Sequence, residues 1–244
     1  MVLVRARNPS NIGAVARAMH DFGFRHLRVV NEYVVPFEEA RSAVDAAAVL
    51  ASAKACTSLA DAVEDCTLVV GTTAVGARAL EHPLHSLPEA SEAIRAHLAS
   101  GDARVALLFG SEKTGLSNEE LSHCNWLLTI PMQQHGDLRH PSMNLGQAAA
   151  VCLYELVRQP GVHAGTGVRE PARAGEMERL TALFGETLEA AGYTRRHPSN
   201  SSKEQIRRLV LRMGLSAADG PVWMGIFRQI LWKIRRNDEA NHEL

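Results

Sequence analysis

The sequence lacks an excess of charge of either sign. Its 26 lysines and arginines stand against 27 aspartates and glutamates, which leaves a formal net charge of −1. The chain therefore has no overall basic character, although such an average can hide a local basic patch. Charge alone is only weak evidence against a nucleic acid as partner.

Cysteine pairs are lacking too. The cysteines are scattered and none forms a Cys-x-x-Cys pair, so the sequence suggests neither a zinc ribbon nor a disulfide framework. A reduced, cytoplasmic compartment fits this usage best. The four cysteines are Cys56, Cys66, Cys124 and Cys152.

Long apolar runs are also absent. No run approaches the ~18 residues needed to span a bilayer, and no signal peptide precedes the first strand-like segment. We therefore expect no membrane partner. The 244 residues, 46% of them hydrophobic, suffice for one core or for a core with a small appendage.

Short apolar runs alternate with helix-like stretches over residues 1–159. The runs are rich in leucine and β-branched residues, as is typical of buried parallel strands. Strand–helix alternation predicts an α/β domain whose mainly parallel sheet is covered on both faces. The strand-like runs are 2–4, 27–30, 68–70, 105–109 and 127–130, and the helix-like stretches are 11–22, 38–53, 88–99 and 144–158.

The chain changes character after residue 159. Residues 160–174 have the glycine and proline content of a linker. Over 175–244, apolar residues recur at helical spacing, which predicts a small all-helical extension. This extension is locally basic, through Arg195, Arg196, Lys203, Arg207, Arg208, Arg212, Arg228, Lys233, Arg235 and Arg236.

The loops that leave the predicted strands are the place to look for chemistry, because open parallel sheets bind ligands beyond the carboxyl ends of their strands. Four such loops are rich in glycine, serine, threonine and asparagine. These residues let backbone approach a ligand closely and offer small donors and acceptors. The loops are 5–13, 71–74, 110–117 and 131–144.

Two common nucleotide-binding motifs are disfavoured. Gly110 and Gly115 have the spacing of a P-loop, but Leu116 and Ser117 stand where lysine and serine or threonine should follow. No Gly-x-Gly-x-x-Gly opens a helix after the first strand, which disfavours a dinucleotide-binding fold. The pair His82 and His85 lacks the further partners of a metal site, so we expect no metal.

The combination of loops is more specific than any single loop. Taken alone, Ser142 and Asn144 are explained as helix caps, and Arg17 as a solvated helix residue. Together the loops resemble the three ordered motifs of SPOUT-class RNA 2'-O-methyltransferases, over residues 1 to about 158, and the tail looks like that of the TrmJ branch. The resemblance lies in Asn11-Ile12-Gly13 with Arg17, in Phe109 to Ser117, in Pro141 to Leu145 and, in the tail, in Ile206 to Leu209 and Gly225-Ile226.

The resemblance implies a domain with a trefoil knot, one of the few exceptions to the rule against threaded chains. It also implies S-adenosylmethionine as cofactor, tRNA as substrate and a homodimer whose active sites combine both subunits. The expected target is the ribose of cytidine or uridine at position 32 of the anticodon loop. Two alternatives stay open, a ribosomal RNA ribose methyltransferase and a catalytically silent RNA-binding module. The implied cofactor contacts are Thr72, Thr73, Ala74, Gly110, Ile130, Ser142 and Met143.

The expected catalytic residues are Arg17, Asn11, Ser142 and Asn144. A ribose hydroxyl is a poor nucleophile until its proton leaves, so the protein must align the substrates and stabilise charge on oxygen. A guanidinium stays protonated at neutral pH, so we expect Arg17 to act through its charge. The resemblance further implies that Arg17 serves the cofactor held by the partner chain. Asn11 and Asn144 either position Arg17 and the loops, contact the RNA, or only satisfy backbone groups. Glu112 could orient Arg17 or the loop around it.

RNA contact is expected to be largely electrostatic. Arg7 and Arg17 on the first loop and helix, and Arg207 and Arg208 in the tail, are the expected phosphate contacts. The alternative for the tail arginines is that they form the solvated face of an amphipathic helix. No role is assigned to His135, Arg139 and His140.

Overall fold

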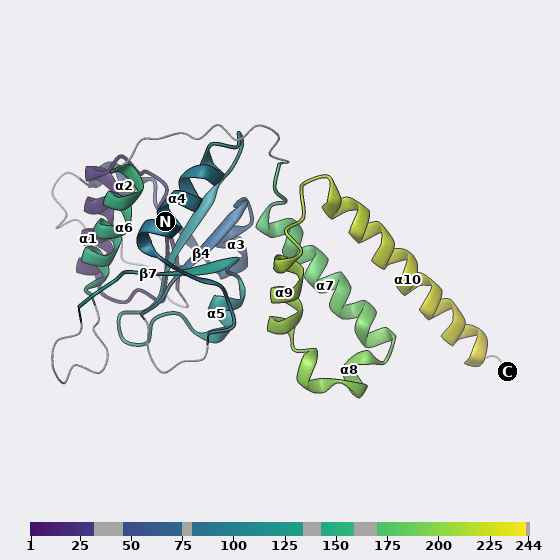
Figure 1. The fold of residues 1–244 in the computed structure, drawn as a ribbon. Coiled ribbons are helices and arrows are strands. Elements are labelled where there is room, and N and C mark those ends of the chain that lie inside the picture. Colours follow the sequence, from purple (N-terminus) through teal and green to yellow (C-terminus); the bar gives the residue numbers. More distant parts are fainter. Residues whose placement is uncertain (32–45, 75–79, 134–142, 159–169, 243–244) are drawn as a thin grey trace.

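The computed structural model describes residues 1–31, 46–74, 80–133, 143–158 and 170–242, the side chains as far as 237. Within these residues seven strands form one sheet in the order β3-β2-β1-β6-β4-β7-β5, and all neighbouring strands are parallel. Figure 1 shows this sheet with the helical tail beside it. The strands are β1 (Val2–Val4), β2 (Arg28–Val30), β3 (Lys54–Cys56), β4 (Leu68–Thr72), β5 (Leu84–Ser86), β6 (Val105–Phe109) and β7 (Trp126–Thr129).

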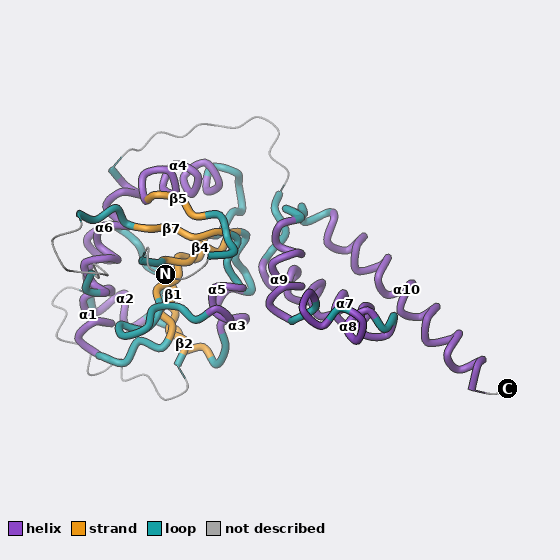
Figure 2. Tube along the Cα trace, turned by 60° about the horizontal axis from the view of Figure 1, so that its bottom comes forward, coloured by secondary structure: helices purple, strands orange, loops and turns teal. Residues whose placement is uncertain are grey.

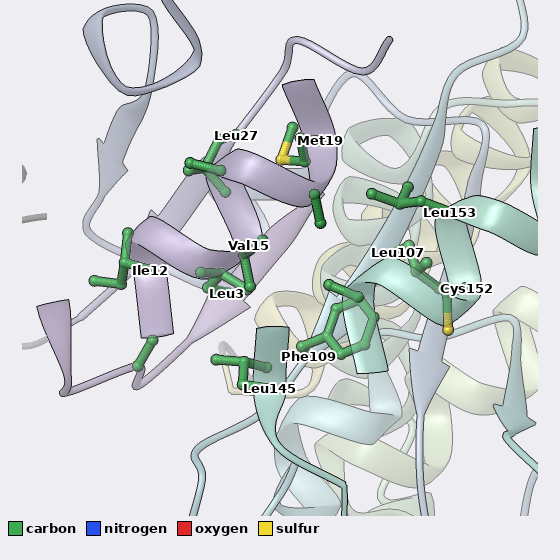
Figure 3. Packing of buried hydrophobic residues seen from close by; sticks show 14 of the residues in the cluster. Leu3, Ile12, Val15, Met19, Leu27, Leu107, Phe109, Leu145, Cys152 and Leu153 are labelled. Atoms are coloured by element: carbon green, nitrogen blue, oxygen red, sulfur yellow. The ribbon is translucent and has the colours of Figure 1, made fainter. Parts of the chain in front are cut away.

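Helices cover both faces of the sheet. Side chains alternate between the two faces along each strand, and the strands carry apolar side chains on both, so both faces need cover. In β1, Leu3 faces one buried cluster, while Val2 and Val4 face the other. Figure 3 shows part of the first cluster, in which Leu3 packs with helix residues such as Val15. That face carries α1 (Pro9–Asp21), α2 (Ala47–Ala51), α4 (Leu87–Leu98) and α6 (Leu145–Val157), and the other carries α3 (Leu59–Val63) and α5 (Asn118–Ser122).

The predicted α/β class with a mainly parallel sheet is confirmed, and all five predicted strands are present. The sequence missed β3 and β5, because these short edge strands contain no apolar run. The end of the helix predicted over 38–53 is present as α2, which ends two residues early, and its first part lies outside the described residues. The trefoil knot depends on the path through 134–142, which also lies outside them, so it stays a prediction.

The tail forms its own small helical cluster against the α3 and α5 side of the sheet. Its core is built from Leu180, Val210 and Phe227, and α7 packs on α3 while α9 packs on α5. Figures 1 and 2 show the tail helices beside the sheet and α10 extending away from it. The tail elements are α7 (Ala174–Ala190), α8 (Tyr193–Arg196), a short 3-10 helix (Pro198–Asn200), α9 (Lys203–Arg212) and α10 (Asp219–His242). No helix in the described residues combines the length and apolarity needed to cross a bilayer.

Two tail arginines expected to contact RNA are used inside the protein. The Arg207 side chain is only 5% exposed; it donates to both Glu178 oxygens, at 2.9 and 3.0 Å, and to the Ser122 hydroxyl at 2.5 Å. The Arg208 side chain is 13% exposed and pairs with Glu81. Neither arginine lies on a solvated helix face, because carboxylates and a hydroxyl replace their hydration. The expectation that these two arginines contact phosphate is therefore corrected.

His123 lies beside this junction and is held neutral. Burial lowers the pKa of its imidazole to about 4, helped by the nearby charges of Arg207 and Lys203 and opposed by those of Glu178 and Glu120. An unfolded histidine titrates near 6.5. Between these two values the native state binds fewer protons than the unfolded chain, so lowering the pH favours unfolding.

Replacing His123 with glutamine should therefore flatten the pH dependence of stability. For the unmodified protein we expect this histidine alone to lower the free energy of unfolding by about 2 kcal/mol between pH 7 and pH 5. Urea titrations at both pH values measure the difference. His20→Gln, at an exposed position, is the control and should keep the slope. An identical slope in the His123 variant contradicts the burial argument.

Candidate functional site

The loop after β6 is a tight turn that requires glycine at its start. A Cβ on Gly110 would lie 2.2 Å from the carbonyl carbon of Gly115 and 2.3 Å from the nitrogen of Leu116. The Gly115 amide donates to the Ser111 carbonyl at 2.8 Å, and Gly115 has φ of +65°. The loop folds back on itself in this way, so it keeps one shape beyond the end of the sheet.

Arg5 holds this loop from the end of β1. Its guanidinium donates to the Gly115 carbonyl at 3.0 Å and to Glu120 at 2.6 and 2.9 Å. Glu120 in turn accepts from the Ser117 amide at 2.6 Å and completes a capping box at the start of α5. Burial opposes ionisation of Glu120, but the bonds from Arg5 and Ser117 outweigh it, and its pKa is lowered. We did not predict this role; the Ser-x-x-Glu signature from Ser117 to Glu120 was the available signal.

Predicted cofactor residues come together at the carboxyl ends of three neighbouring strands, because β4 lies between β6 and β7. The Thr72 hydroxyl donates to the Leu108 carbonyl at 2.9 Å, and the Thr73 amide donates to the Leu128 carbonyl at 3.0 Å. These bonds fix the three strand ends relative to one another. The residues brought to this edge are Thr72, Thr73, Ala74, Gly110 and Ile130.

One hydrogen-bonded chain links the three motifs. The Asn11 side chain donates to Glu112 at 2.9 Å, and the Asn144 side chain donates to the Asn11 oxygen at 3.3 Å. Asn144 also caps α6, because its oxygen accepts from the Gly146 amide at 2.9 Å. The capping explanation for Asn144 is thus confirmed, and the same side chain also contacts Asn11. Its expected catalytic role stays a prediction. Met143 directly precedes this cap, and Ser142 lies outside the described residues.

Glu112 takes part in this hydrogen-bonded network as an ionised carboxylate. Partial burial opposes its ionisation, but hydrogen bonds from the Asn11 side chain and from nearby backbone amides, including that of Asn8, outweigh this cost and lower its pKa. Glu112 therefore orients Asn11 of the same subunit. Among the described residues it makes no bond to Arg17. The first and second motifs are held together by this one side chain.

Arg17 is exposed on α1 and forms no hydrogen bond or ion pair among the described residues. It lies about 9 Å along the helix axis from Asn11. Helices α1 and α6 run side by side in the same direction, with Ala14 against Gly146 and Phe22 against Tyr154. Arg17 therefore lies on the outer surface of this helix pair rather than over the loops of its own chain.

Helix α6, which runs beside α1, exposes several apolar side chains. Tyr154 is 51% exposed, and Val151 and Val157 are exposed on the same helix. Arg7, on the loop after β1, is exposed near the start of α1. A cavity of about 360 Å³ lies at the opposite edge, lined in part by Met1 and Val105, and so is remote from the loops described here.

The chain is similar to known proteins along nearly its whole length. The model of the SpoU rRNA Methylase family matches residues 1–154. The tRNA (cytidine/uridine-2'-O-)-methyltransferase TrmJ of Pectobacterium atrosepticum is 31% identical over 94% of this chain and 95% of that protein. The tRNA (cytidine-2'-O-)-methyltransferase TrmJ of Methanocaldococcus jannaschii is 29% identical over 93% and 97%. The crystal structure of TrmJ from Z. mobilis ZM4 matches with a TM-score of 0.78 at 26% identity, over 94% of this chain and 97% of that one.

Replacing Gly110 with alanine should destabilise the protein by about 2–3 kcal/mol, because the new methyl group would overlap backbone that cannot move without opening the turn. Guanidinium titration measures this loss. Gly225→Ala is the control, because a Cβ there would meet nothing within 4 Å; it should be neutral or stabilise α10 by up to about 1 kcal/mol. Equal stability of the two variants contradicts the tight turn.

Proposed function

We propose that this chain, which belongs to the SpoU rRNA Methylase family, transfers a methyl group from S-adenosylmethionine to a ribose 2'-hydroxyl of tRNA. The observation that carries the proposal is the chain Glu112–Asn11–Asn144, which joins the three motifs at one edge of the sheet. Two relatives that match 93% and 94% of this chain are named as tRNA 2'-O-methyltransferases. Position 32 and the acceptance of cytidine or uridine belong to the proposal, as does a cytoplasmic location.

The residues at the carboxyl edge fit S-adenosylmethionine. Backbone amides and carbonyls end three adjacent strands there, and the side chains next to them are small. Thr72 to Ala74, Gly110, Ile130 and Met143, with Ser142, would hold the cofactor largely through backbone groups. When bound, it supplies a methyl group whose leaving group becomes a neutral sulfide.

The protein's own residues align the two substrates and stabilise the charge that develops on the ribose oxygen. Asn11 and Asn144, fixed by Glu112, hold the loop and helix ends in register so that the reacting groups meet in line. Arg17 offers a planar, permanently charged fork that stabilises charge developing on the ribose oxygen and binds phosphate. The proton of the hydroxyl leaves to water or to a nearby group.

Arg17 acts in the site of a partner subunit in this proposal. It is exposed and makes no bond to the loops of its own chain among the described residues, and the neighbouring α6 also exposes Val151, Tyr154 and Val157. Exposed apolar side chains beside a polar functional residue suit a two-fold interface, where the same patch serves both subunits. The proposed assembly is a homodimer with shared sites.

Arg7 and exposed cations of the tail bind RNA phosphates in this proposal. They replace Arg207 and Arg208, which are used inside the protein. Phosphate contacts position the RNA without reading its sequence. Among the described residues, exposed tail cations that form no ion pair within the tail include Arg195, Arg196, Arg212, Arg228 and Lys233.

The function is tested by mapping 2'-O-methyl marks after incubating the purified protein with S-adenosylmethionine and RNA. Transcripts of tRNA and fragments of ribosomal RNA are compared, because the family's description names rRNA. Methylation of a tRNA anticodon-loop ribose supports the proposal. Marks on ribosomal RNA alone, or cofactor binding without any marks, would replace it by the corresponding alternative.

Arg17→Lys should reduce methyl transfer about 100-fold, because an ammonium cannot reproduce the planar fork of a guanidinium. The affinity for S-adenosylmethionine should change less than about twofold, because Arg17 lies outside the proposed cofactor contacts. Transfer of a radiolabelled methyl group and calorimetry measure the two quantities. Arg25→Lys, at an exposed position after α1, is the matched control. Near wild-type turnover of the Arg17 variant would overturn its role.

Mixing two inactive variants tests the shared site. A dimer of Arg17→Lys and Asn144→Ala subunits contains one site with both residues intact, provided that Arg17 serves the partner. After subunit exchange, about a quarter of wild-type activity should return, because half of the dimers are mixed and each has one intact site of two. Each variant alone is the control. No recovery despite proven exchange would mean that each subunit uses its own Arg17.

A further inference from the structure

Arg207 joins three helices through one buried guanidinium. It belongs to α9 and makes a two-pronged pair with Glu178 of α7, so most of its charge is balanced inside the tail. The guanidinium also donates to the Ser122 hydroxyl at 2.5 Å, and this bond crosses from the tail to the α/β domain. Ser122 is fully buried. This bond therefore connects the tail directly to the last residue of α5.

Helix α5 is short and is fixed at both ends. At its end, the Ser122 hydroxyl donates to the Glu119 carbonyl at 2.6 Å while accepting from Arg207. At its start, Glu120 receives the guanidinium of Arg5. A helix of five residues has little stability of its own, so its position depends on these outside partners.

The glycine loop continues directly into α5. Ser117 caps the helix and Leu116 is buried against the second core cluster, while Gly115 is held by the same Arg5 that pairs with Glu120. A shift of α5 would therefore move the anchors of the loop that begins at Gly110. Because packed segments move as units rather than deforming continuously, such a shift reaches the far end of the loop.

We propose that Arg207 is a positioning residue for the cofactor site. Through Ser122 and α5 it couples the helical tail to the loop from Gly110 to Ser117, so that RNA on the tail and S-adenosylmethionine at the loop strengthen each other's binding. This inference rests on the proposed function. Both ligands favour the docked arrangement of tail and α5, and two ligands that favour one state bind with positive and reciprocal coupling.

The burial of Arg207 alone would require only a structural role. A purely structural role predicts a lower melting temperature and unchanged binding constants in the folded protein. Coupling predicts a change in cofactor affinity and in its dependence on tRNA, in variants that remain folded. Measurements of cofactor affinity therefore distinguish the two roles, whereas a change in melting temperature does not.

Ser122→Ala is the sharpest variant, because it removes the bond from Arg207 to α5 and leaves the pair of Arg207 with Glu178. It also removes the bond from the Ser122 hydroxyl to the Glu119 carbonyl, which lies within α5. We expect tRNA to lower the Kd for S-adenosylmethionine about fivefold or more in the wild type. In Ser122→Ala the Kd without tRNA should rise about fivefold, and the effect of tRNA should fall below about twofold. The KM for the cofactor should rise more than kcat falls. Calorimetry with and without tRNA, on protein shown to be folded by circular dichroism, provides the values.

Two further variants separate geometry from charge. Arg207→Lys keeps the charge and reaches one partner, so it should recover part of the coupling lost in Arg207→Met. Glu186→Gln is the control: it breaks the pair between α7 and Arg235 of α10, leaves the cations of the tail in place, and should behave as wild type. Wild-type Kd and coupling in Ser122→Ala would overturn the inference while leaving the proposed function intact. A wild-type protein that binds no S-adenosylmethionine would overturn both.

Discussion

The hydrogen bonds from Glu112 to Asn11 and from Asn11 to Asn144 join residues that lie 101 and 133 positions apart in the chain. Each bond contributes only about 1 kcal/mol, or somewhat more where the carboxylate accepts. Their importance is positional, because no other side-chain network among the described residues joins the start of α1, the loop after β6 and the start of α6. Without them the three motifs would be neighbours at one edge but not a set with fixed relative positions.

The sheet brings these motifs close before any side chain fixes them. Parallel strands β1, β6, β4 and β7 are neighbours, so their loops leave from the same edge. The close contact of Gly146 with Ala14, where a Cβ would lie 2.6 Å from the alanine methyl carbon, then brings α6 against α1. Backbone topology thus sets the approximate arrangement, and small residues and amides refine it.

Much of this arrangement could be predicted from the sequence, because buried strands require apolar runs and turns require glycine. The edge strand β5 could not, because half of its surroundings are solvent and its residues Leu84 to Ser86 form no pattern. Arg5 was missed because its role depends on φ of +56° and on partners more than 100 positions away. Arg207 was misplaced for a related reason. A basic residue in an amphipathic helix has the same spacing whether it faces water or a buried carboxylate such as Glu178, and only the tertiary structure distinguishes the two.

The parallel course of α1 and α6 has an electrostatic consequence. Both helices begin at asparagine caps, Asn8 and Asn144, that are connected to Glu112 directly or through Asn11. The amino ends of two helix dipoles, each equivalent to about half a positive charge, therefore converge on one carboxylate. Glu112 balances the positive potential that these two helix starts would otherwise create where the three motifs meet.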